Sequence, residues 1–326
     1  QVDSRADSSL DRIQNERREF EIRSKHAKEI YWGNPDRKEV EALTRHLEKS
    51  FKSGRVLDWR QTLSAVHLSF SLNSCNFSVP GSGKTTTVYA GYSHLKEKGS
   101  VDKILVIGPQ SCFRPWESEY QKCFNETPNS IRLNKVSSNE RVNFLKSKVS
   151  QELILMSFAT MANFVDQLVE FLELNSKVMV VIDEAHYIKR VDGGVWAPAA
   201  LKISPYAASR VVLTGTPAPN GYEDLFNLFE FIWPKKNLIP FGLSTLMDLS
   251  EKTIKKGVID SHTNKKINQV VDSLKPYFVR IRKKDLGLPE PIDHPVITVE
   301  MSPLQKKIYD SIEDKELKDF VNLDEE

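Results

Sequence analysis

A glycine-rich segment between a strand-like run and a helix-like run constrains the fold of this 326-residue chain more than any other feature. The segment, residues 78–86, reads Ser-Val-Pro-Gly-Ser-Gly-Lys-Thr-Thr. In such a loop, the backbone N–H groups and the N-terminus of the next helix bind the phosphates of a nucleotide. Lys84 would reach toward the phosphates, and the Thr85 hydroxyl would bind Mg²⁺. Ser78 stands where the strict pattern has its first glycine, so a Gly-Ser-Gly turn in an unrelated loop is the alternative.

A second feature is the apolar run of residues 178–182, which ends in Asp183 and Glu184. The run is typical of a buried parallel strand, which would bring both carboxylates to the carboxyl edge of a sheet. Because Mg²⁺ is held by one or two carboxylates and several waters, we expect Asp183 to be an outer partner of the ion. Glu184 is expected to orient and deprotonate an attacking water. An isolated Asp-Glu pair would more often be an ordinary strand end, but the upstream phosphate loop favours the catalytic interpretation.

A third short apolar run, residues 211–213, ends in Thr214, Gly215 and Thr216. Hydroxyl groups at a strand edge can bond to His186, two residues after Glu184, and couple the nucleotide site to movement elsewhere. Alone, this segment would most often be a turn. Three strand-edge motifs in this order are a stronger indication than any one of them.

Strand-like and helix-like segments alternate from residue 75 onward, which predicts an α/β fold with a mainly parallel sheet covered by helices on both faces. Ligands bind at the carboxyl ends of the strands in such sheets, where all three motifs fall. The predicted strands are 75–79, 104–108, 153–157, 178–182 and 211–214, and the predicted helices are 85–98, 113–124, 137–150, 159–174 and 222–232.

Together the motifs resemble the first motor lobe of the superfamily-two helicase-like ATPases, in the Swi/Snf-related branch of DNA translocases and remodellers. The resemblance spans about residues 55 to 312. Besides the three motifs, it rests on Gln61, which lies 23 positions before Lys84, and on residues 104–111, Trp116-Glu117, 153–158, 183–189, 213–220, 280–284, Leu288-Pro289, Gln305 and Tyr309.

The resemblance implies a RecA-like P-loop lobe that binds ATP and Mg²⁺, with Lys84, Asp183, Glu184 and His186 in catalytic roles and Thr85 and Asp183 at the metal. It implies that Gln61 reads adenine, and that the nucleotide is held by Gly81, Ser82, Gly83, Lys84, Thr85 and Thr86. Nucleic-acid contact or coupling is implied for Pro109, Gln110, Ser111, Ser157, Thr214, Gly215 and Thr216. Duplex DNA is the expected partner.

Three departures from the family pattern matter. Residues 57–61 lack the aromatic that the family has immediately before the glutamine, and Arg190 and Pro219 replace residues that are commonly Asn and Gln. No second lobe is found before Glu326, so we expect a fragment without the arginine fingers of the missing half. Because such arginines contribute roughly 10³–10⁵ in rate in comparable NTPases, we expect residues 1–326 alone to be nearly inert.

The chain is expected to have four parts. Residues 1–54 would be a charged helical extension with an amphipathic helix at 37–51, and residues 55–240 the ATP-binding lobe. Residues 241–285 would be a helical, basic protrusion, since residues 251–285 contain ten Lys or Arg against four Asp or Glu. This excess suggests a contact with the DNA backbone, although a solvated protrusion is an equal alternative. Residues 286–326 would hold a strand at 296–300 and a helix at 303–322 leading to the second lobe.

Composition sets further bounds. The three cysteines form no C-x-x-C pair, which argues against a disulfide framework or a zinc site and for a reducing compartment. No apolar run approaches about 18 residues, so we expect no membrane contact and a soluble intracellular protein, in the cytoplasm or nucleoid of a prokaryote or the nucleus of a eukaryote. Trp116, Phe158 and Trp196 could stack bases, but their apolar neighbours favour core packing.

Two other function classes stay open beside the DNA-dependent ATPase. One is the motor subunit of a restriction or phage-defence system, which uses the same lobe. The other is a non-motor P-loop signalling ATPase, in which nucleotide binding switches a partner. DNA-stimulated hydrolysis by the intact protein would separate both motors from the signalling protein. The oligomeric state is not predicted.

Overall fold

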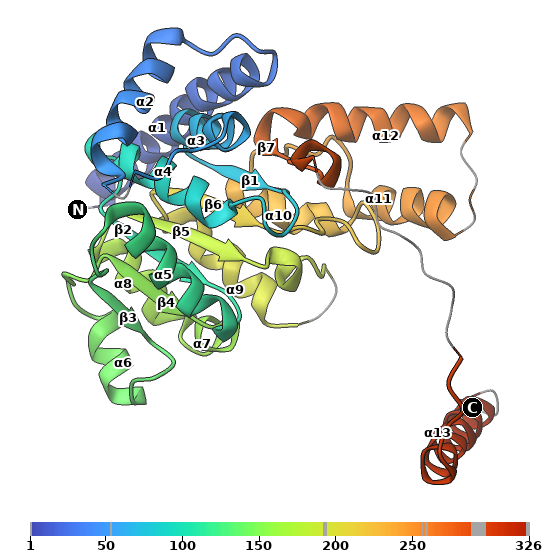
Figure 1. Cartoon of the computed structure of the whole chain (residues 1–326). Helices are drawn as coiled ribbons and strands as arrows, with labels where there is room; N and C mark the ends of the chain where they lie inside the picture. The colour runs from blue at the N-terminus through green and yellow to red at the C-terminus, as the bar shows by residue number, and fades with distance from the viewer. Residues whose placement is uncertain are drawn as a thin grey trace. The chain divides into compact units, whose positions relative to one another are not determined.

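The computed structural model describes the backbone of residues 2–52, 54–191, 194–255, 257, 260–287 and 298–323. Side chains are described for these residues from 17 to 254 and from 257 to 313. Residues 1–286 and 287–326 form two compact units, which are described separately. The first unit contains the sheet and all three strand-edge motifs (Figure 1).

The sheet of the first unit is parallel throughout its described strands, with the order β3-β4-β2-β5-β6-β1-β7. The predicted parallel α/β fold is therefore confirmed. The strands are β1 (Ser74–Asn76), β2 (Lys103–Ile107), β3 (Ser130–Arg132), β4 (Leu153–Met156), β5 (Val178–Asp183), β6 (Ser209–Leu213) and β7 (Phe278–Val279).

The register of the sheet brings the motifs to one edge. Asp183, the last residue of β5, is level with Leu213 of β6, and Leu213 is in turn level with Asn76, the last residue of β1. The segments that follow these three strands therefore leave the sheet side by side. This alignment places the glycine-rich loop and the two carboxylates at the same carboxyl edge.

Helices cover both faces of the sheet, as predicted (Figure 1). Alternate residues of a strand point to opposite faces. Accordingly, Val180 and Ile182 of β5 belong to one buried cluster, with residues of α6–α10, and Met179 and Val181 belong to another, with residues of α2–α5. The helices in these clusters are α2 (Arg37–Ser50), α3 (Trp59–Ser71), α4 (Lys84–Glu97), α5 (Phe113–Phe124), α6 (Ser138–Leu145), α7 (Phe158–Asn163), α8 (Val165–Leu174), α9 (Trp196–Ile203) and α10 (Asp224–Ile232).

The N-terminal helix α1 (Val2–Tyr31) packs within the first unit against α3 and the 3₁₀ helix η5 (Lys275–Tyr277). Phe20 lies edge-on to Trp233 at a centroid distance of 5.0 Å, and Ser24 bonds to the Tyr277 hydroxyl at 2.6 Å. Residues 243–274 contribute α11 (Leu243–Ser250) and α12 (Ser261–Leu274), in keeping with the predicted helical region. The four-part division of the chain stays a prediction.

The second unit contains α13 (Pro303–Leu323), where a helix was predicted at 303–322. Of the strand predicted at 296–300, residues 296–297 lie outside the described residues, and residues 298–300 form no strand. Within the described part of the chain, no helix has the length and apolar character needed to cross a membrane.

Candidate nucleotide site

The glycine-rich loop connects β1 to α4, and its two glycines have backbone conformations that favour glycine. Gly81 and Gly83 both have φ of +81°. Gly83 is also crowded, because a Cβ atom at this position would lie 2.4 Å from Nε2 of Gln61. Gly83 caps α4 without a side-chain hydrogen bond to the first helical N–H groups. Those N–H groups are the donors that a helix N-terminus offers to a phosphate.

Ser78, which replaces the first glycine of the strict motif, is fully buried and has a structural partner. Its Oγ accepts a hydrogen bond of 2.9 Å from the backbone N–H of Ile281, just beyond β7. The side chain thus anchors the start of the loop to the edge of the sheet. A glycine could not make this bond.

Lys84 opens α4 and lies over the loop that precedes it. Its Nζ donates to the carbonyl oxygen of Ser78 at 3.0 Å and lies 3.5 Å from that of Val79. Burial lowers the pKa of the Lys84 ammonium, while the charges of Glu184 and then Asp183 oppose this shift. The ammonium and both carboxylates line the same pocket.

The carboxylate of Asp183 is held at both oxygens. Oδ1 accepts a hydrogen bond of 3.0 Å from the backbone N–H of Glu184, and Oδ2 accepts one of 2.8 Å from Nε1 of Trp116. Glu184 has φ of +53°, a left-handed conformation that is uncommon for a residue with a Cβ atom. Glu184 therefore marks the change from β5 to the 3₁₀ helix η2 (Ala185–Ile188).

These groups line one pocket of about 580 Å³ at the carboxyl edge of the sheet. The pocket brings together seven of the residues predicted from the sequence: Gly81, Gly83, Lys84, Thr85, Thr86, Asp183 and Glu184. It also has walls that the sequence motifs did not indicate, which are Arg55, Arg114, Pro115, Ser118, Glu119 and Lys122. Cations around a phosphate loop suit a polyanionic ligand.

The donors in this pocket fit Mg²⁺ bound together with a nucleotide. Thr85 supplies a hydroxyl that makes no hydrogen bond among the described residues, and Asp183 supplies a fixed carboxylate. The described side chains contain no group of three or more His, Cys, Asp or Glu that could hold a metal alone. This is the pattern expected for Mg²⁺, which takes one or two carboxylates and completes its shell with phosphate oxygens and water.

Gln61 contacts the loop from α3. Its Nε2 donates to the carbonyl oxygen of Ser82 at 3.2 Å, and its Oε1 accepts from the N–H of Asp58 at 3.1 Å as part of a capping box. Ser82 itself is buried, and Thr86 lines the pocket. Gln61 is not among the residues that line the pocket, although its amide has further donor and acceptor capacity.

Arg55 and Glu119 were not found from the sequence. Arg55 Nη2 lies 2.7 Å from Glu119 Oε1, and the same oxygen accepts from the Thr86 hydroxyl at 2.5 Å. Their positions 55 and 119 are far apart in the chain, and neither belongs to a glycine-rich or strand-edge motif. The local sequence therefore carries no sign of this contact.

The expected bond between the strand-edge hydroxyls and His186 is absent from the described residues. The Thr214 hydroxyl instead accepts from the N–H of Thr216 at 3.2 Å. His186 Nδ1 lies 3.2 Å from Glu184 Oε2, without the alignment of a hydrogen bond. Gly215 does approach the glycine-rich loop, since a Cβ atom there would lie 3.2 Å from Pro80.

The other predicted contact residues also follow strands. Pro109 precedes the 3₁₀ helix η1 (Gln110–Cys112), which contains Gln110 and Ser111 and leads into α5. Ser157 caps α7, with its Oγ accepting from the Thr160 N–H at 3.2 Å. These segments follow β2 and β4 and share the carboxyl edge with the pocket.

The aromatic side chains considered for base stacking belong to the core. Trp116 is completely buried, and Phe158 is 4% exposed. Trp196 is partly buried and stacks on Phe158 at a centroid distance of 5.5 Å. The interpretation as core packing is therefore confirmed for Trp116 and Phe158.

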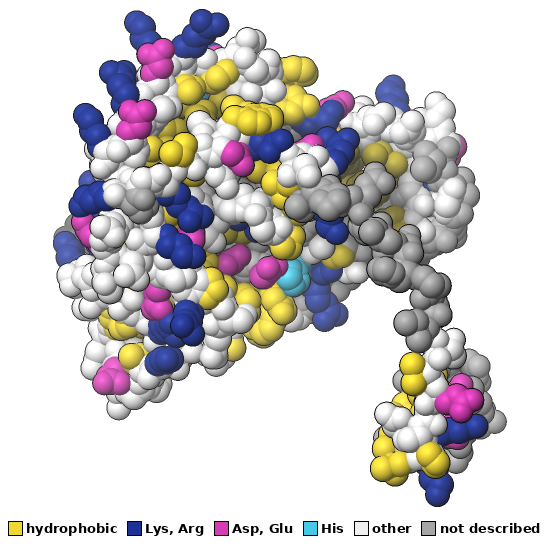
Figure 2. Space-filling model, viewed as in Figure 1, with side chains coloured by type: hydrophobic (Ala, Val, Ile, Leu, Met, Phe, Trp, Pro, Cys, Tyr) yellow, Lys and Arg dark blue, Asp and Glu magenta, His cyan; other side chains and the backbone are white. Residues whose placement is uncertain are grey.

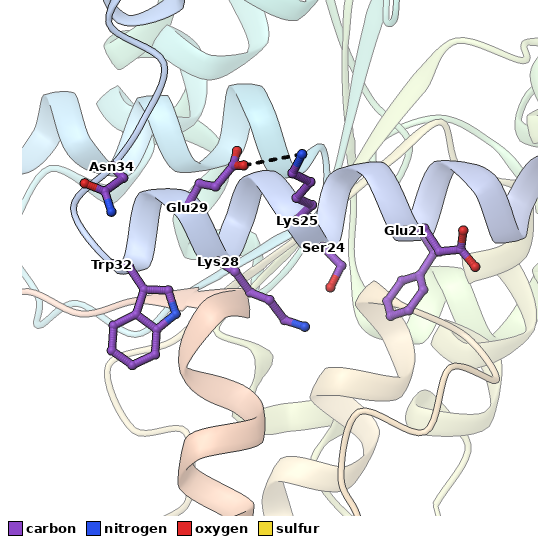
Figure 3. Close-up of a pocket in the computed structure, with 8 residues that line it drawn as sticks. Glu21, Ser24, Lys25, Lys28, Glu29, Trp32 and Asn34 are labelled. Atoms are coloured by element: carbon purple, nitrogen blue, oxygen red, sulfur yellow. Dashed lines mark ion pairs between the residues drawn. The ribbon is translucent and has the colours of Figure 1, made fainter.

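A second pocket of about 550 Å³ lies along α1. Figure 3 shows its lining, in which Lys25 pairs with Glu29 at 3.8 Å, Lys28 extends from the same helix, and Trp32 directly follows the helix. Its lining residues include neither the glycine-rich loop nor a strand-end carboxylate. The first pocket is therefore the candidate nucleotide site.

Comparison with known proteins supports the family that the sequence motifs resemble. Residues 77–325 match the model of the SNF2-related domain. The ATP-dependent helicase FUN30 of Saccharomyces cerevisiae is 27% identical over 237 residues, which is 71% of this chain and 20% of FUN30. The chromatin remodeling factor mit1 of Schizosaccharomyces pombe is 24% identical, covering 74% of this chain and 16% of mit1. An uncharacterized ATP-dependent helicase of Mycoplasma pneumoniae is 26% identical, over 74% of this chain and 22% of that protein.

The chain thus spans about a fifth of the length of these curated relatives. Among solved structures, the Sulfolobus solfataricus SWI2/SNF2 ATPase core in complex with dsDNA matches with a TM-score of 0.58 and 23% identity, over 74% of this chain and 48% of that one. That likeness supports the fold, a RecA-like α/β lobe. Because the family model matches most of the sequence, the chain belongs to the SNF2-related family of helicase-like ATPases.

Proposed function

We propose that this chain is the ATP-binding lobe of a DNA-dependent ATPase that couples ATP hydrolysis to movement along duplex DNA or to remodelling of protein–DNA complexes. The observation that carries the proposal is one pocket lined by Lys84 and Thr85 at the start of α4 and by Asp183 and Glu184 at the end of β5. A phosphate-binding loop beside strand-end carboxylates is an arrangement that P-loop NTPases use to hold the phosphates and Mg²⁺.

Each residue would have a separate task. The N–H groups at the start of α4 and the Lys84 ammonium would bind the phosphates, and Lys84 would leave its carbonyl partners in the loop to do so. Thr85 and Asp183 would hold Mg²⁺, which when bound supplies positive charge that offsets the charge of the phosphates. Glu184 would orient the attacking water and accept its proton. Gln61 would contact the adenine beside the loop.

Hydrolysis would require a second lobe that supplies arginines. Arginines that stabilise the transferred phosphoryl group contribute roughly 10³–10⁵ in rate in comparable NTPases. Of the cations that line this pocket, Arg55 and Lys122 pair with Glu119, and Lys84 donates to carbonyl oxygens of the loop. We therefore propose that residues 1–326 alone bind nucleotide and turn it over slowly.

Duplex DNA is proposed as the track because the matching Sulfolobus core was solved with dsDNA and the relatives are named as helicases and a chromatin remodeling factor. On the face shown in Figure 2, Lys and Arg side chains lie in small groups between Asp and Glu. In residues 251–285, Lys252, Lys275 and Arg282 pair with nearby acids, while Lys283 and Lys284 are exposed. These two lysines are the proposed contribution of this region to phosphate contacts.

The test is phosphate release by the full-length protein and by residues 1–326, each with and without duplex DNA. We expect stimulation by DNA only in the full-length protein, and loss of turnover with retained ATP binding in its Glu184→Gln variant. Strong DNA-stimulated turnover by residues 1–326 would refute the need for a second lobe. ATP binding without any response to DNA in the full-length protein would favour a signalling ATPase.

A further inference from the structure

Trp116 makes a contact that core packing does not explain. It is completely buried among apolar residues of the cluster under α4 and α5, yet its Nε1 donates a hydrogen bond of 2.8 Å to Oδ2 of Asp183. An indole N–H is a donor only, and a buried one needs an acceptor. Here the acceptor is the carboxylate at the end of β5 that faces the pocket.

The hydrogen bond fixes the orientation of the carboxylate. The terminal torsion of an aspartate is soft, so its carboxylate turns readily when few contacts hold it. Oδ1 is held by the N–H of Glu184 at 3.0 Å, and Oδ2 is held by the indole. With one donor at each oxygen, the plane of the carboxylate is defined before any ligand enters.

The indole is itself held rigidly. The ring of Tyr89 lies edge-on to that of Trp116 at a centroid distance of 5.3 Å, and the Tyr89 hydroxyl donates to the carbonyl oxygen of Trp116 at 2.8 Å. Tyr89 belongs to α4, the helix that begins at Lys84 and carries Thr85. Trp116 therefore links the helix that carries the Thr85 hydroxyl to the strand that carries the Asp183 carboxylate.

A neutral donor suits this position better than a cation would. A lysine or arginine at the same distance would orient the carboxylate but would also cancel its charge. An indole N–H orients it and leaves the negative charge available to a cation in the pocket. The thiol of Cys112, one helical turn before Trp116, also lies beside Asp183, but a thiol is a weak donor.

We propose that Trp116 is a positioning residue that holds Asp183 in the orientation needed to bind Mg²⁺ together with ATP. The proposal rests on the proposed function, because it assumes that the pocket binds this pair. It predicts that loss of the indole N–H raises the Mg²⁺ concentration needed for tight ATP binding. The affinity for ATP without Mg²⁺, which depends on the contacts of the loop with the nucleotide, should not change.

The experiment is calorimetric titration of ATP into residues 1–326 at a series of Mg²⁺ concentrations and in EDTA. Mg²⁺ should increase the affinity for ATP, and the Mg²⁺ concentration that gives half of this increase is the quantity to compare. In Trp116→Phe it should rise about tenfold, as expected for loss of a hydrogen bond to a charged group. The affinity measured in EDTA should stay within about twofold of the wild type. Phenylalanine is smaller than tryptophan, so a second variant preserves the shape of the side chain. It has at position 116 the tryptophan analogue with sulfur in place of the indole N–H, and it should give the same result.

Tyr92→Phe, on α4, is the matched control. It removes hydrogen bonds to the carbonyl oxygen of Asp102 and to the Glu152 carboxylate, and it leaves the contacts of Trp116 in place. It should lower the thermal unfolding midpoint without changing the Mg²⁺ requirement. The double variant Trp116→Phe/Asp183→Asn should depend on Mg²⁺ in the same way as Asp183→Asn alone, because the indole would act only through Asp183.

The outcomes separate this inference from the proposed function. An unchanged Mg²⁺ requirement in folded Trp116→Phe or in the analogue would overturn the positioning role, and so would an equal loss of affinity with Mg²⁺ and in EDTA. A wild-type chain that does not bind ATP at all would contradict the proposed function itself.

Discussion

Ser78 and Ile281 are joined across 203 positions of sequence by a hydrogen bond of 2.9 Å, from the Ile281 N–H to the Ser78 hydroxyl. Val79 donates to the Ile281 carbonyl oxygen at 3.0 Å, and Phe77 donates to that of Val279 at 2.8 Å. The pairing of β1 with β7 therefore continues along the start of the phosphate loop. The loop is fixed at the edge of the sheet by the residue that departs from the strict motif.

Replacing Ser78 should destabilise the fold. Ser78→Ala leaves the Ile281 N–H without its partner, which should lower the free energy of unfolding by about 1–3 kcal/mol, and Ser78→Gly should cost at least as much. Ser82→Ala is the control in the same loop, because the buried Ser82 hydroxyl has no partner among the described residues and its removal should be neutral or stabilising. Urea unfolding of the three variants checks this, and equal effects at both positions would contradict it.

The two loop glycines should respond differently to alanine. Gly81→Ala adds a methyl group in open space at φ of +81° and should cost only the backbone strain, about 1 kcal/mol. Gly83→Ala has the same φ and also forces Gln61 away, because its Cβ would lie 2.4 Å from Nε2. It should cost more stability and should lower the preference for ATP over GTP. Unfolding and competition binding measure the two effects; similar values for both variants would show that Gln61 does not pack on Gly83.

Acid should destabilise the fold partly through His94. Burial first, and then the charges of Lys98 and His46, lower its pKa from 6.5 to about 4, while the charge of Glu97 opposes the shift. The unfolded chain therefore takes up a proton below pH 6.5 that the folded chain does not accept until about pH 4, so stability falls as the pH drops through this window. The loss is on the order of 3 kcal/mol at its full extent.

His94→Leu should flatten this part of the pH dependence, measured by urea unfolding between about pH 7 and pH 4.5. Some dependence should remain, because burial also lowers the pKa of His67. His262→Leu, at an exposed position, is the control and should behave as the wild type. An unaltered slope in His94→Leu would exclude His94 as a source of acid sensitivity.

Reversing the charges of Lys283 and Lys284 to Glu should weaken DNA binding by the full-length protein and reduce its dependence on salt. Two lost phosphate contacts should lower the slope of log K against log salt by about 2. Lys148 and Lys177, exposed before β4 and β5 at the opposite edge of the sheet, are the matched control pair. Fluorescence anisotropy with a labelled duplex would show it; an equal change in both pairs would argue for a general charge effect.

The central strands and the phosphate loop could be predicted because their information is local. Buried runs such as β2 and β5 are apolar except for Lys103 at the start of β2 and Asp183 at the end of β5, and the loop carries its glycines and lysine together. The edge strands β3, with three half-buried residues, and β7, with two residues, are too short to produce a recognisable pattern. β3 and β7 form strands because they pair with β4 and β1. The residues of β3 and β7 alone do not indicate this pairing.

The pocket could be predicted only in part for the same reason. Lys84, Thr85, Asp183 and Glu184 each belong to a strand-edge motif, so parallel topology places them together. Arg55, Glu119 and the indole of Trp116 enter through helix packing between distant segments. Trp116 was correctly expected in the core, but an apolar neighbourhood in sequence does not show that its one polar atom contacts Asp183.

The most direct test of the account is calorimetric titration of Mg²⁺-ATP into residues 1–326 and into the Lys84→Met and Asp183→Asn variants. Lys84→Met should stay folded, because burial disfavours the charged ammonium that the substitution removes. Its affinity for Mg²⁺-ATP should fall at least about tenfold. Asp183→Asn should lose the gain in affinity that Mg²⁺ provides. We predict that the wild type binds Mg²⁺-ATP saturably and that each substitution weakens this binding as stated. Absence of binding by the wild type, or affinity unchanged in Lys84→Met, would contradict the assignment of this pocket.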